Sequence, residues 1–202
     1  MTIENIQYEN KYFEQGYLYI AGVDECGRGS LAGPVAAAAV IFPRGCLIEG
    51  VTDSKKLGVK KREALFPVIL ERALAVGIAM VDADIIDEIN ILQASLRAMG
   101  AALSNLSLRP EIALIDGRFL PDIHLNPDVK MEALIGGDGK SLAIGAASIV
   151  AKVTRDRLMA EYAKTYPAYG FDKNKGYGTA AHYAVLRDYG PCPIHRRSFR
   201  LE

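Results

Sequence analysis

The sequence predicts one α/β domain, built on a mixed sheet, with a helical extension at its C-terminal end. Strand-like segments come first, strand-like and helix-like segments then alternate, and helix-like segments close the chain. The 202 residues are 50% hydrophobic, which suffices for one core, and we find no repeat or long linker among them.

The expected elements follow from local periodicity. Residues 17–23 (YLYIAGV) are aromatic and β-branched, and the apolar run 35–42 predicts a second, buried strand. Apolar residues at helical spacing predict a long amphipathic helix over 84–106. Further strands are expected at 73–81, 111–115 and 129–135, and further helices at 60–72, 141–165 and 179–189. We divide the chain into a polar N-terminal segment (1–16), a main domain (17–165) and a C-terminal helical extension (166–202) of the same folded unit.

Composition disfavours several classes of protein. No apolar run approaches the roughly 20 residues that a membrane helix needs, and residues 1–16 lack the apolar centre of a signal peptide. We therefore expect a cytoplasmic protein without a membrane partner. Cys26, Cys46 and Cys192 do not form the pattern of a disulfide scaffold. Cys192 and His195 have no matching second pair of ligands for zinc.

Four carboxylates stand where a metal ion could reach them. Asp24 and Glu25 follow the first strand, Asp116 follows the strand at 111–115, and Asp138 has glycine on both sides. Open α/β sheets gather ligands at strand C-termini, and Mg²⁺ and Mn²⁺ prefer oxygen ligands. Two such ions about 3.5–4 Å apart can support phosphodiester cleavage. Each acid alone is explained at least as well as an ordinary turn residue, and spacing does not show that the four meet.

The glycine-rich segment 27–33 (GRGSLAG) admits two interpretations. After a strand it resembles a dinucleotide-binding loop. Asp24 and Glu25 would repel a pyrophosphate, however, and an apolar strand follows instead of the helix that should hold the phosphate. The glycines would also let backbone groups approach a nucleic acid or a ribose hydroxyl.

Basic residues gather in the last quarter of a chain whose formal net charge is +0. This local excess of basic residues predicts a nucleic-acid face, although a solvated helical surface explains it about as well. The candidate phosphate contacts are Lys152, Lys173, Lys175, Arg196 and Arg197. A non-catalytic nucleic-acid-binding module is disfavoured, because a phosphate binder gains nothing from clustered carboxylates.

Seven ordered segments together resemble the type 2 ribonucleases H, over about residues 18–199. They are GVDECGRGSLAGPV (22–35), DSKKL (53–57), LIDG (114–117), GD (137–138), AASIVAKVTRD (146–156), KGYGTAAH (175–182) and HRRSF (195–199). The resemblance implies a ribonuclease H-like fold, with a mixed five-stranded sheet flanked by helices. It also implies an endonuclease that cuts the RNA strand of RNA–DNA hybrids and cuts 5′ of ribonucleotides in duplex DNA, leaving 3′-hydroxyl and 5′-phosphate ends. Such an enzyme removes misincorporated ribonucleotides.

The resemblance assigns roles to individual residues. Asp24, Glu25, Asp116 and Asp138 match the catalytic carboxylates, which would hold Mg²⁺ or Mn²⁺. Gly27, Arg28 and Gly29 match the loop that senses the ribose 2′-hydroxyl, and Tyr177 matches the tyrosine that stacks at the RNA–DNA junction. Lys55, Ser148 and Lys152 are further expected substrate contacts.

Some features refine the resemblance. Cys26 stands where the family usually has alanine, a residue of similar size, so we expect it to be inert. We interpret Asp156 as part of a structural ion pair, because Asp138 fits the fourth carboxylate position better. The sibling ribonuclease HIII has a sizeable extra N-terminal domain. Only about 16 residues precede the first expected strand here, which favours the HII type. We expect a monomer without tail-mediated sliding-clamp binding, since no glutamine-led aromatic motif follows Phe199.

Overall fold

The computed structural model describes residues 6–122 and 129–202. Its centre is a five-stranded mixed sheet in the order β3-β2-β1-β4-β5. The strands are β1 (Ile20–Cys26), β2 (Val35–Ile41), β3 (Ala75–Val81), β4 (Ile112–Asp116) and β5 (Lys130–Leu134). β1, β2 and β3 pair antiparallel, whereas β4 runs parallel to both β1 and β5. The predicted mixed sheet is therefore confirmed.

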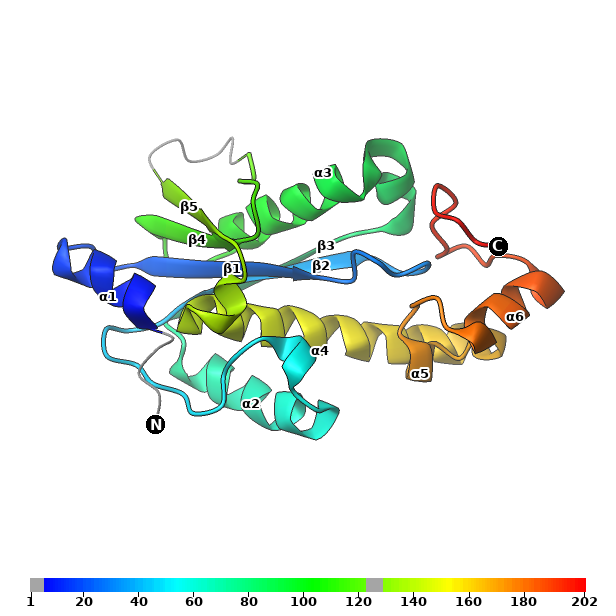
Figure 1. Ribbon diagram of the computed structural model, residues 1–202, viewed down its shortest axis with the longest axis horizontal. Helices are drawn as coiled ribbons and strands as arrows, with labels where there is room; N and C mark the ends of the chain where they lie inside the picture. Colours follow the sequence, from blue (N-terminus) through cyan, green and yellow to red (C-terminus); the bar gives the residue numbers. More distant parts are fainter. Residues whose placement is uncertain (1–5, 123–128) are drawn as a thin grey trace.

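Helices cover both faces of the sheet. α3 (Ala83–Ser104) lies on one face, and α2 (Val59–Arg72) and α4 (Leu142–Thr165) lie on the other (Figure 1). β2 is buried along its whole length, because α3 packs on one side of it and α4 on the other. This double burial explains why its sequence is an unbroken apolar run rather than an alternating one.

The long helix expected over 84–106 is interrupted. Asn90 has a φ of 69° inside α3, and its Oδ1 accepts hydrogen bonds from the N–H groups of Leu92 and Gln93 at 3.0 and 3.1 Å. The side chain thus acts as an N-cap for the second part of the helix. Helical spacing of the apolar residues continues across the break, so periodicity alone did not reveal it.

α4 packs very closely against the central strand. A Cβ added at Gly22 in β1 would lie 2.2 Å from the backbone carbon of Ala143, so no larger residue fits there. Ser141 caps the helix by accepting a hydrogen bond from the Ile144 N–H at 3.1 Å. The close approach of Gly22 to Ala143 sets the distance between α4 and β1, the strand that carries Asp24 and Glu25.

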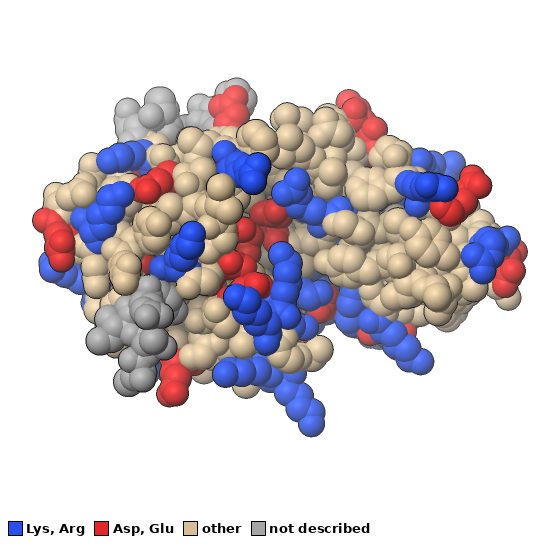
Figure 2. Space-filling model, in the orientation of Figure 1, with Lys and Arg blue, Asp and Glu red and all other residues tan. Residues whose placement is uncertain are grey.

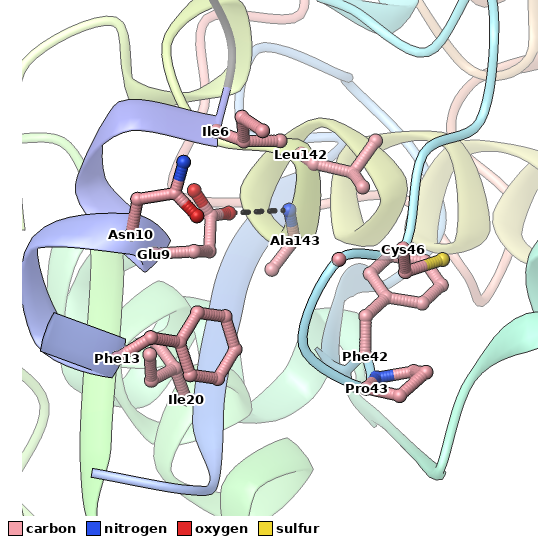
Figure 3. Close-up of a pocket in the computed structure, with 11 residues that line it drawn as sticks. Ile6, Glu9, Asn10, Phe13, Ile20, Phe42, Pro43, Cys46, Leu142 and Ala143 are labelled. Carbon is pink, nitrogen blue, oxygen red and sulfur yellow. Dashed lines mark hydrogen bonds between the residues drawn. The ribbon is translucent and has the colours of Figure 1, made fainter. Parts of the chain in front are cut away.

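The N-terminal segment contains a helix that was not predicted, α1 (Gln7–Glu14). Its Glu9 is buried, and Glu9 Oε1 accepts hydrogen bonds from Ser141 Oγ at 2.6 Å and from Ala143 N at 3.0 Å. Figure 3 shows this carboxylate beside a small pocket between α1, the start of α4 and the loop that follows β2. α1 therefore anchors the beginning of α4.

The C-terminal extension packs on the far half of α4. It contains a 3₁₀ turn (Pro167–Tyr169), α5 (Phe171–Asn174) and α6 (Ala180–Tyr189). Its small core joins Phe171 and Cys192 to Met159 of α4 and to Ala32, in the loop that follows β1. Among the helices of the described residues, none combines the length and the hydropathy needed to cross a membrane.

Candidate active site

Asp24 and Glu25 lie within β1. The sequence had suggested instead that they follow the strand, in a turn. The antiparallel pairing with β2 continues through Asp24, Glu25 and Cys26, whereas the parallel pairing with β4 ends at Val23 and Ile115. Asp24 is buried and Glu25 half-buried. Asp24 Oδ1 accepts a hydrogen bond from the Glu25 N–H at 2.7 Å.

Asp116 and Asp138 are brought together by the end of β4. Asp116 is the last residue of that strand, and its Oδ1 accepts a hydrogen bond from the N–H of Gly137 at 2.7 Å. Gly137 begins the 3₁₀ turn Gly137–Gly139, which carries Asp138 and leads into α4. The Asp138 loop is thus a short ordered turn that the Asp116 carboxylate holds.

The four carboxylates influence one another electrostatically. Burial raises the pKa of Asp24 well above its usual value, and the charges of Glu25 and Asp116 raise it further. Burial also raises the pKa of Asp138 to about 6, with Asp116 and Asp53 adding to the effect. The fold therefore gathers the carboxylates that the sequence spreads over more than a hundred positions, and it places their negative charges where they destabilise one another.

This acidic cluster fits a hard divalent cation. Glu25 Oε2 is buried without a hydrogen-bond donor, a costly state for a carboxylate oxygen unless a cation compensates it. Within residues 6–122 and 129–202, no three His, Cys, Asp or Glu side chains converge tightly enough to form a ready-made ligand set. Mg²⁺ does not require a closed set of this kind, because it usually takes one or two protein carboxylates and retains several waters.

Asp53 is a member of the cluster that sequence analysis did not single out. Its carboxylate accepts a hydrogen bond from the Lys55 N–H at 2.8 Å and thereby caps the turn Ser54–Lys56, and it lies close enough to Asp138 to raise the pKa of that carboxyl. Burial lowers the pKa of Lys55, but Asp24, Asp53 and other nearby carboxylates outweigh burial and raise it. Lys55 is exposed, so it stands at the edge of the acidic cluster.

Ser148 supports the site from within. We expected it to contact substrate, but it is buried, and its Oγ lies 2.8 Å from Ser54 Oγ. Its hydrogen bond to Asp24 lowers the pKa of that carboxyl and so opposes the effect of burial. Ser148 therefore positions Asp24 and links it to the 53–57 segment.

Cys26 is the last residue of β1 and is half-buried. All three cysteines are free, and burial raises the pKa of the Cys26 thiol, so this side chain stays protonated at neutral pH. Its side chain packs against the hydrophobic cluster between the sheet and α4.

The Gly-Arg-Gly loop (27–29) is held by a buried arginine. Arg196 donates hydrogen bonds to the carbonyl oxygens of Gly27, Arg28 and Gly33, at 2.7, 2.8 and 3.0 Å. The prediction that Arg196 contacts phosphate is wrong, because its side chain is fully buried and occupied by these carbonyls. Arg28, by contrast, is exposed, with its Nη1 3.3 Å from Glu25 Oε1.

A second buried arginine, which sequence analysis did not assign, fixes the other side of the same loop. Arg155 donates hydrogen bonds to the carbonyl oxygens of Pro34, Lys175 and Ala32, at 2.8, 2.9 and 3.0 Å. Gly27 has a φ of +94°, and an added Cβ would lie 2.1 Å from Arg155 Nε. The loop thus needs glycine at position 27 both for its backbone conformation and for the guanidinium beside it.

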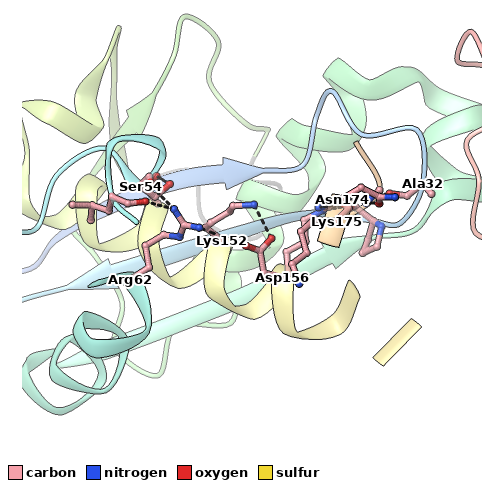
Figure 4. Close-up of polar contacts among 12 residues, drawn as sticks. Ala32, Ser54, Arg62, Lys152, Asp156, Asn174 and Lys175 are labelled. Carbon is pink, nitrogen blue, oxygen red and sulfur yellow. Dashed lines mark hydrogen bonds and ion pairs between the residues drawn. The ribbon is translucent and has the colours of Figure 1, made fainter. Parts of the chain in front are cut away.

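Tyr177 lies next to this loop, although about 150 positions separate them in the sequence. Its backbone forms a bridge with Ser30, and its half-buried ring lies 5.4 Å from Lys152 Nζ. Lys152 also forms an ion pair with Asp156 at 2.6 Å. Asp156 lies 3.9 Å from Arg62 as well (Figure 4), which confirms its interpretation as part of a structural ion pair.

The surface around the site has two kinds of charge. Figure 2 shows acidic side chains gathered near the middle of one face, with Lys and Arg side chains around them. Among the remaining predicted phosphate contacts, Lys173 and Arg197 are exposed and Lys175 is half-buried. An acidic centre with a basic rim suits a metal-assisted reaction on a polyanion.

Sequence comparisons identify the family. The family model described as Ribonuclease HII matches residues 21–202. A protein named Ribonuclease HII from Bacillus subtilis (strain 168) is 53% identical over 192 residues, which cover 95% of this chain and 73% of that protein. Another of that name from Caldicellulosiruptor bescii is 52% identical over 191 residues, covering 95% and 91%.

Solved structures show the same fold. The ribonuclease H2 from Pyrococcus horikoshii OT3 has a TM-score of 0.76 at 27% identity, covering 91% of this chain and 95% of that one. The structure of Bst-RNase HIII in complex with Mn²⁺ has a TM-score of 0.69 at 18% identity, covering 92% and 68%, and shows a shared fold. This chain belongs to the ribonuclease HII family, the endoribonucleases that cleave RNA in RNA–DNA hybrids.

Proposed function

We propose that this chain also cuts duplex DNA on the 5′ side of embedded ribonucleotides, leaving 3′-hydroxyl and 5′-phosphate ends, and so serves in removing misincorporated ribonucleotides. The observation that carries the proposal is the electrostatic coupling among Asp24, Glu25, Asp116 and Asp138, in which neighbouring carboxylates raise the pKa values of Asp24 and Asp138. It is supported by Glu25 Oε2, which is buried without a hydrogen-bond donor. These four residues would hold Mg²⁺ or Mn²⁺ ions.

The chemistry divides between the ions and the protein. Two bound ions would supply a polarised attacking water and stabilisation of the leaving 3′-oxygen. Asp24 is kept in place by Ser148 and by the Glu25 N–H, and Asp116 by the Gly137 N–H. Preorganised carboxylates of this kind need no rearrangement when the phosphate arrives.

Recognition of the ribonucleotide would come from the neighbouring loop. A 2′-hydroxyl is the group that distinguishes RNA from DNA at one nucleotide. Gly29 has no neighbour within 4 Å of the position of an added Cβ, so the backbone of the Gly-Arg-Gly loop is open to close approach there. Arg28 is exposed, and Tyr177 lies beside the same loop with a flat ring for stacking. Lys55, Lys152, Lys173, Lys175 and Arg197 are proposed to contact or neutralise backbone phosphates.

We further propose that the chain acts as a cytoplasmic monomer. The Archaeoglobus fulgidus structure described as a PCNA:RNase HII complex has a TM-score of 0.73 at 27% identity, covering 92% of this chain and 96% of that one.

One assay tests the proposed activity. Labelled duplexes with one ribonucleotide, four ribonucleotides, an all-RNA strand or only DNA are incubated with Mg²⁺ or Mn²⁺. We expect a cut immediately 5′ of the single ribonucleotide, with a 3′-hydroxyl that a polymerase extends and a 5′-phosphate that a ligase accepts. The all-DNA duplex should stay intact. Cleavage of the all-RNA hybrid alone would overturn the proposal while leaving the family assignment untouched.

A further inference from the structure

A buried pair of histidines joins two segments of the C-terminal extension. His182 Nε2 and His195 Nε2 lie 2.9 Å apart, with His182 0% and His195 2% exposed. The rings of Tyr169 and Phe171 pack against both of them. The roles proposed above use neither histidine.

Hydrogen bonds fix where the protons of this pair lie. The Cys192 N–H donates to His195 Nδ1 at 2.9 Å, while the Cys192 carbonyl oxygen and Sγ lie farther from the same nitrogen, at 3.3 and 3.1 Å. The shortest of these contacts places the proton of the neutral His195 ring on Nε2. That proton points at His182 Nε2, which must accept it. His182 therefore carries its own proton on Nδ1, which donates to the carbonyl oxygen of Tyr177 at 3.0 Å.

The complete set of bonds requires both rings to be neutral. A further proton on His182 Nε2 would set two N–H groups face to face. A further proton on His195 Nδ1 would break the 2.9 Å bond from the Cys192 N–H and leave only the longer contacts to the Cys192 carbonyl oxygen and Sγ, at 3.3 and 3.1 Å. Burial lowers the pKa of His182, and burial together with the nearby His182 lowers the pKa of His195 to about 4. At neutral pH the pair is uncharged and has one proton order.

Tyr177 and His195, which His182 connects, lie on either side of the loop that follows β1. Tyr177 forms a backbone bridge with Ser30, and His195 forms one with Ala32. The Leu31 N–H donates to the Gly176 carbonyl, and the Leu31 carbonyl accepts from the Arg196 N–H, both at 2.8 Å. The loop therefore lies between two segments that the histidines tie directly to each other.

We propose that His182 and His195 are positioning residues for ribonucleotide recognition: His182, in the tautomer that His195 imposes, holds the main chain of Tyr177 against the Gly-Arg-Gly loop. The inference rests on the proposed function, because it requires Tyr177 to meet the substrate. The position of Tyr177 matters for the cleavage rate, since misplacing a reacting group by about 1 Å can lower the rate by on the order of a hundredfold.

Two substitutions separate the two bonds of His182. In His182→Asn an amide nitrogen replaces Nδ1 and can still donate to Tyr177, while the bond to His195 is lost. In His182→Gln an amide oxygen replaces Nε2 and can still accept from His195, while the bond to Tyr177 is lost. Both remove the same ring from the same aromatic surroundings, so each variant controls for the packing lost in the other.

The measurement is the ratio of single-turnover cleavage rates on a one-ribonucleotide duplex and on an all-RNA hybrid, with melting temperatures alongside. We expect His182→Gln to lower this ratio by roughly tenfold, through the rate and not through substrate affinity, and His182→Asn to stay within about threefold of wild type. An equal fall in both variants, or one that only follows melting temperature, would overturn the proposal.

Nitrogen-15 NMR of the imidazoles tests the proton order in the wild-type protein without any substrate. We expect His182 protonated on Nδ1 and His195 on Nε2 at neutral pH. Any other pair of tautomers would refute the proposal even if the variants fail to fold. Failure of the proposed function looks different, because the wild-type chain would then leave the one-ribonucleotide duplex uncut while the tautomers remain as expected.

Discussion

Arg196 Nη2 donates a hydrogen bond to the carbonyl oxygen of Gly27 at 2.7 Å. Gly27, the residue that directly follows β1, is therefore held by a side chain from near the C-terminal end. Burial, with the nearby Arg155, lowers the pKa of Arg196 to about 9, which leaves it cationic at neutral pH. Its charge is compensated by the dipoles of the three carbonyl groups that it contacts and by the nearby Asp87.

Arg196→Ala should therefore be much more damaging to stability than Arg197→Ala. The first leaves buried carbonyls without donors, which costs about 3 kcal/mol or more. The second removes an exposed side chain, with an effect of about 0.5 kcal/mol or less, and should reduce the salt dependence of substrate binding by about one phosphate contact. Urea unfolding and binding titrations at several salt concentrations measure both effects. Equal unfolding free energies would contradict the structural role of Arg196.

Asp24→Asn and Asp116→Asn should each abolish metal-dependent cleavage while preserving the fold. Each change removes an anionic oxygen from the candidate metal site. Because burial, Glu25 and Asp116 raise the pKa of Asp24, its negative charge destabilises the metal-free fold. Asp24→Asn should therefore melt at or above the wild-type temperature without metal and lose the increase that Mn²⁺ produces. Near wild-type turnover in a folded variant would refute the site.

The stability of the metal-free protein should depend on Asp138 between about pH 4 and pH 6. Its folded-state pKa, about 6, exceeds the ordinary value of 3.8, so its contribution is fully present below the ordinary value and is lost as the pH rises through about 6. The loss should be about 1–3 kcal/mol, since solvent screens part of it. Asp138→Asn should remove this dependence in unfolding curves measured with a chelator present, and it should strongly reduce turnover while sparing substrate binding. If turnover is unchanged, the fourth carboxylate role belongs elsewhere.

His195 should act in the opposite direction as the pH falls. Its folded pKa of about 4 lies below the ordinary 6.5, so its contribution is present above the ordinary value and is lost as the pH falls through about 4. A shift of this size corresponds to about 3 kcal/mol. The comparison that isolates it is wild type against His195→Gln, both carrying Asp138→Asn. Parallel pH profiles of the two would show that His195 is not buried in its neutral form.

Much of the fold could be predicted because its signals are local. The apolar run of β2, and the alanine-rich start and charged end of α4, are features of neighbouring residues that indicate these elements in the sequence. α1 could not be predicted, since its buried Glu9 meets hydrogen-bond donors on α4 that are more than 130 positions away. The break at Asn90 was hidden because the apolar spacing continues through it.

The positions of the candidate site residues could be predicted where family motifs marked them, and not where a residue's contacts are made only in the folded chain. The charge of Asp116 raises the pKa of Asp24, so the fold brings these two carboxylates near each other as expected, and their role as metal ligands stays a prediction. Arg155 and Arg196 look like surface charges in a sequence, and only the folded backbone shows the carbonyls that surround them. Asp53 likewise becomes part of the acidic cluster only through its contact with Asp138.

Tyr177 provides the last prediction, which concerns selectivity. The backbone bridge to Ser30 keeps it beside the Gly-Arg-Gly loop, and the charged ends of Lys152 and Arg155 lie 5.4 and 5.7 Å from its ring centre. Tyr177→Ala should impair cleavage at a single embedded ribonucleotide more than cleavage of a continuous hybrid, because the hybrid offers many alternative registers.

The loss should lie mainly in the chemical step, since the ring would align the scissile phosphate and not supply most of the affinity. Tyr177→Phe keeps the ring and should retain most of the rate if stacking is the main contribution, whereas a loss as large as that of Tyr177→Ala would assign the role to the hydroxyl. Single-turnover rates on both substrates decide between these outcomes. An equal loss on the two substrates, or no loss, would mean that Tyr177 supports the fold and that other residues recognise the junction.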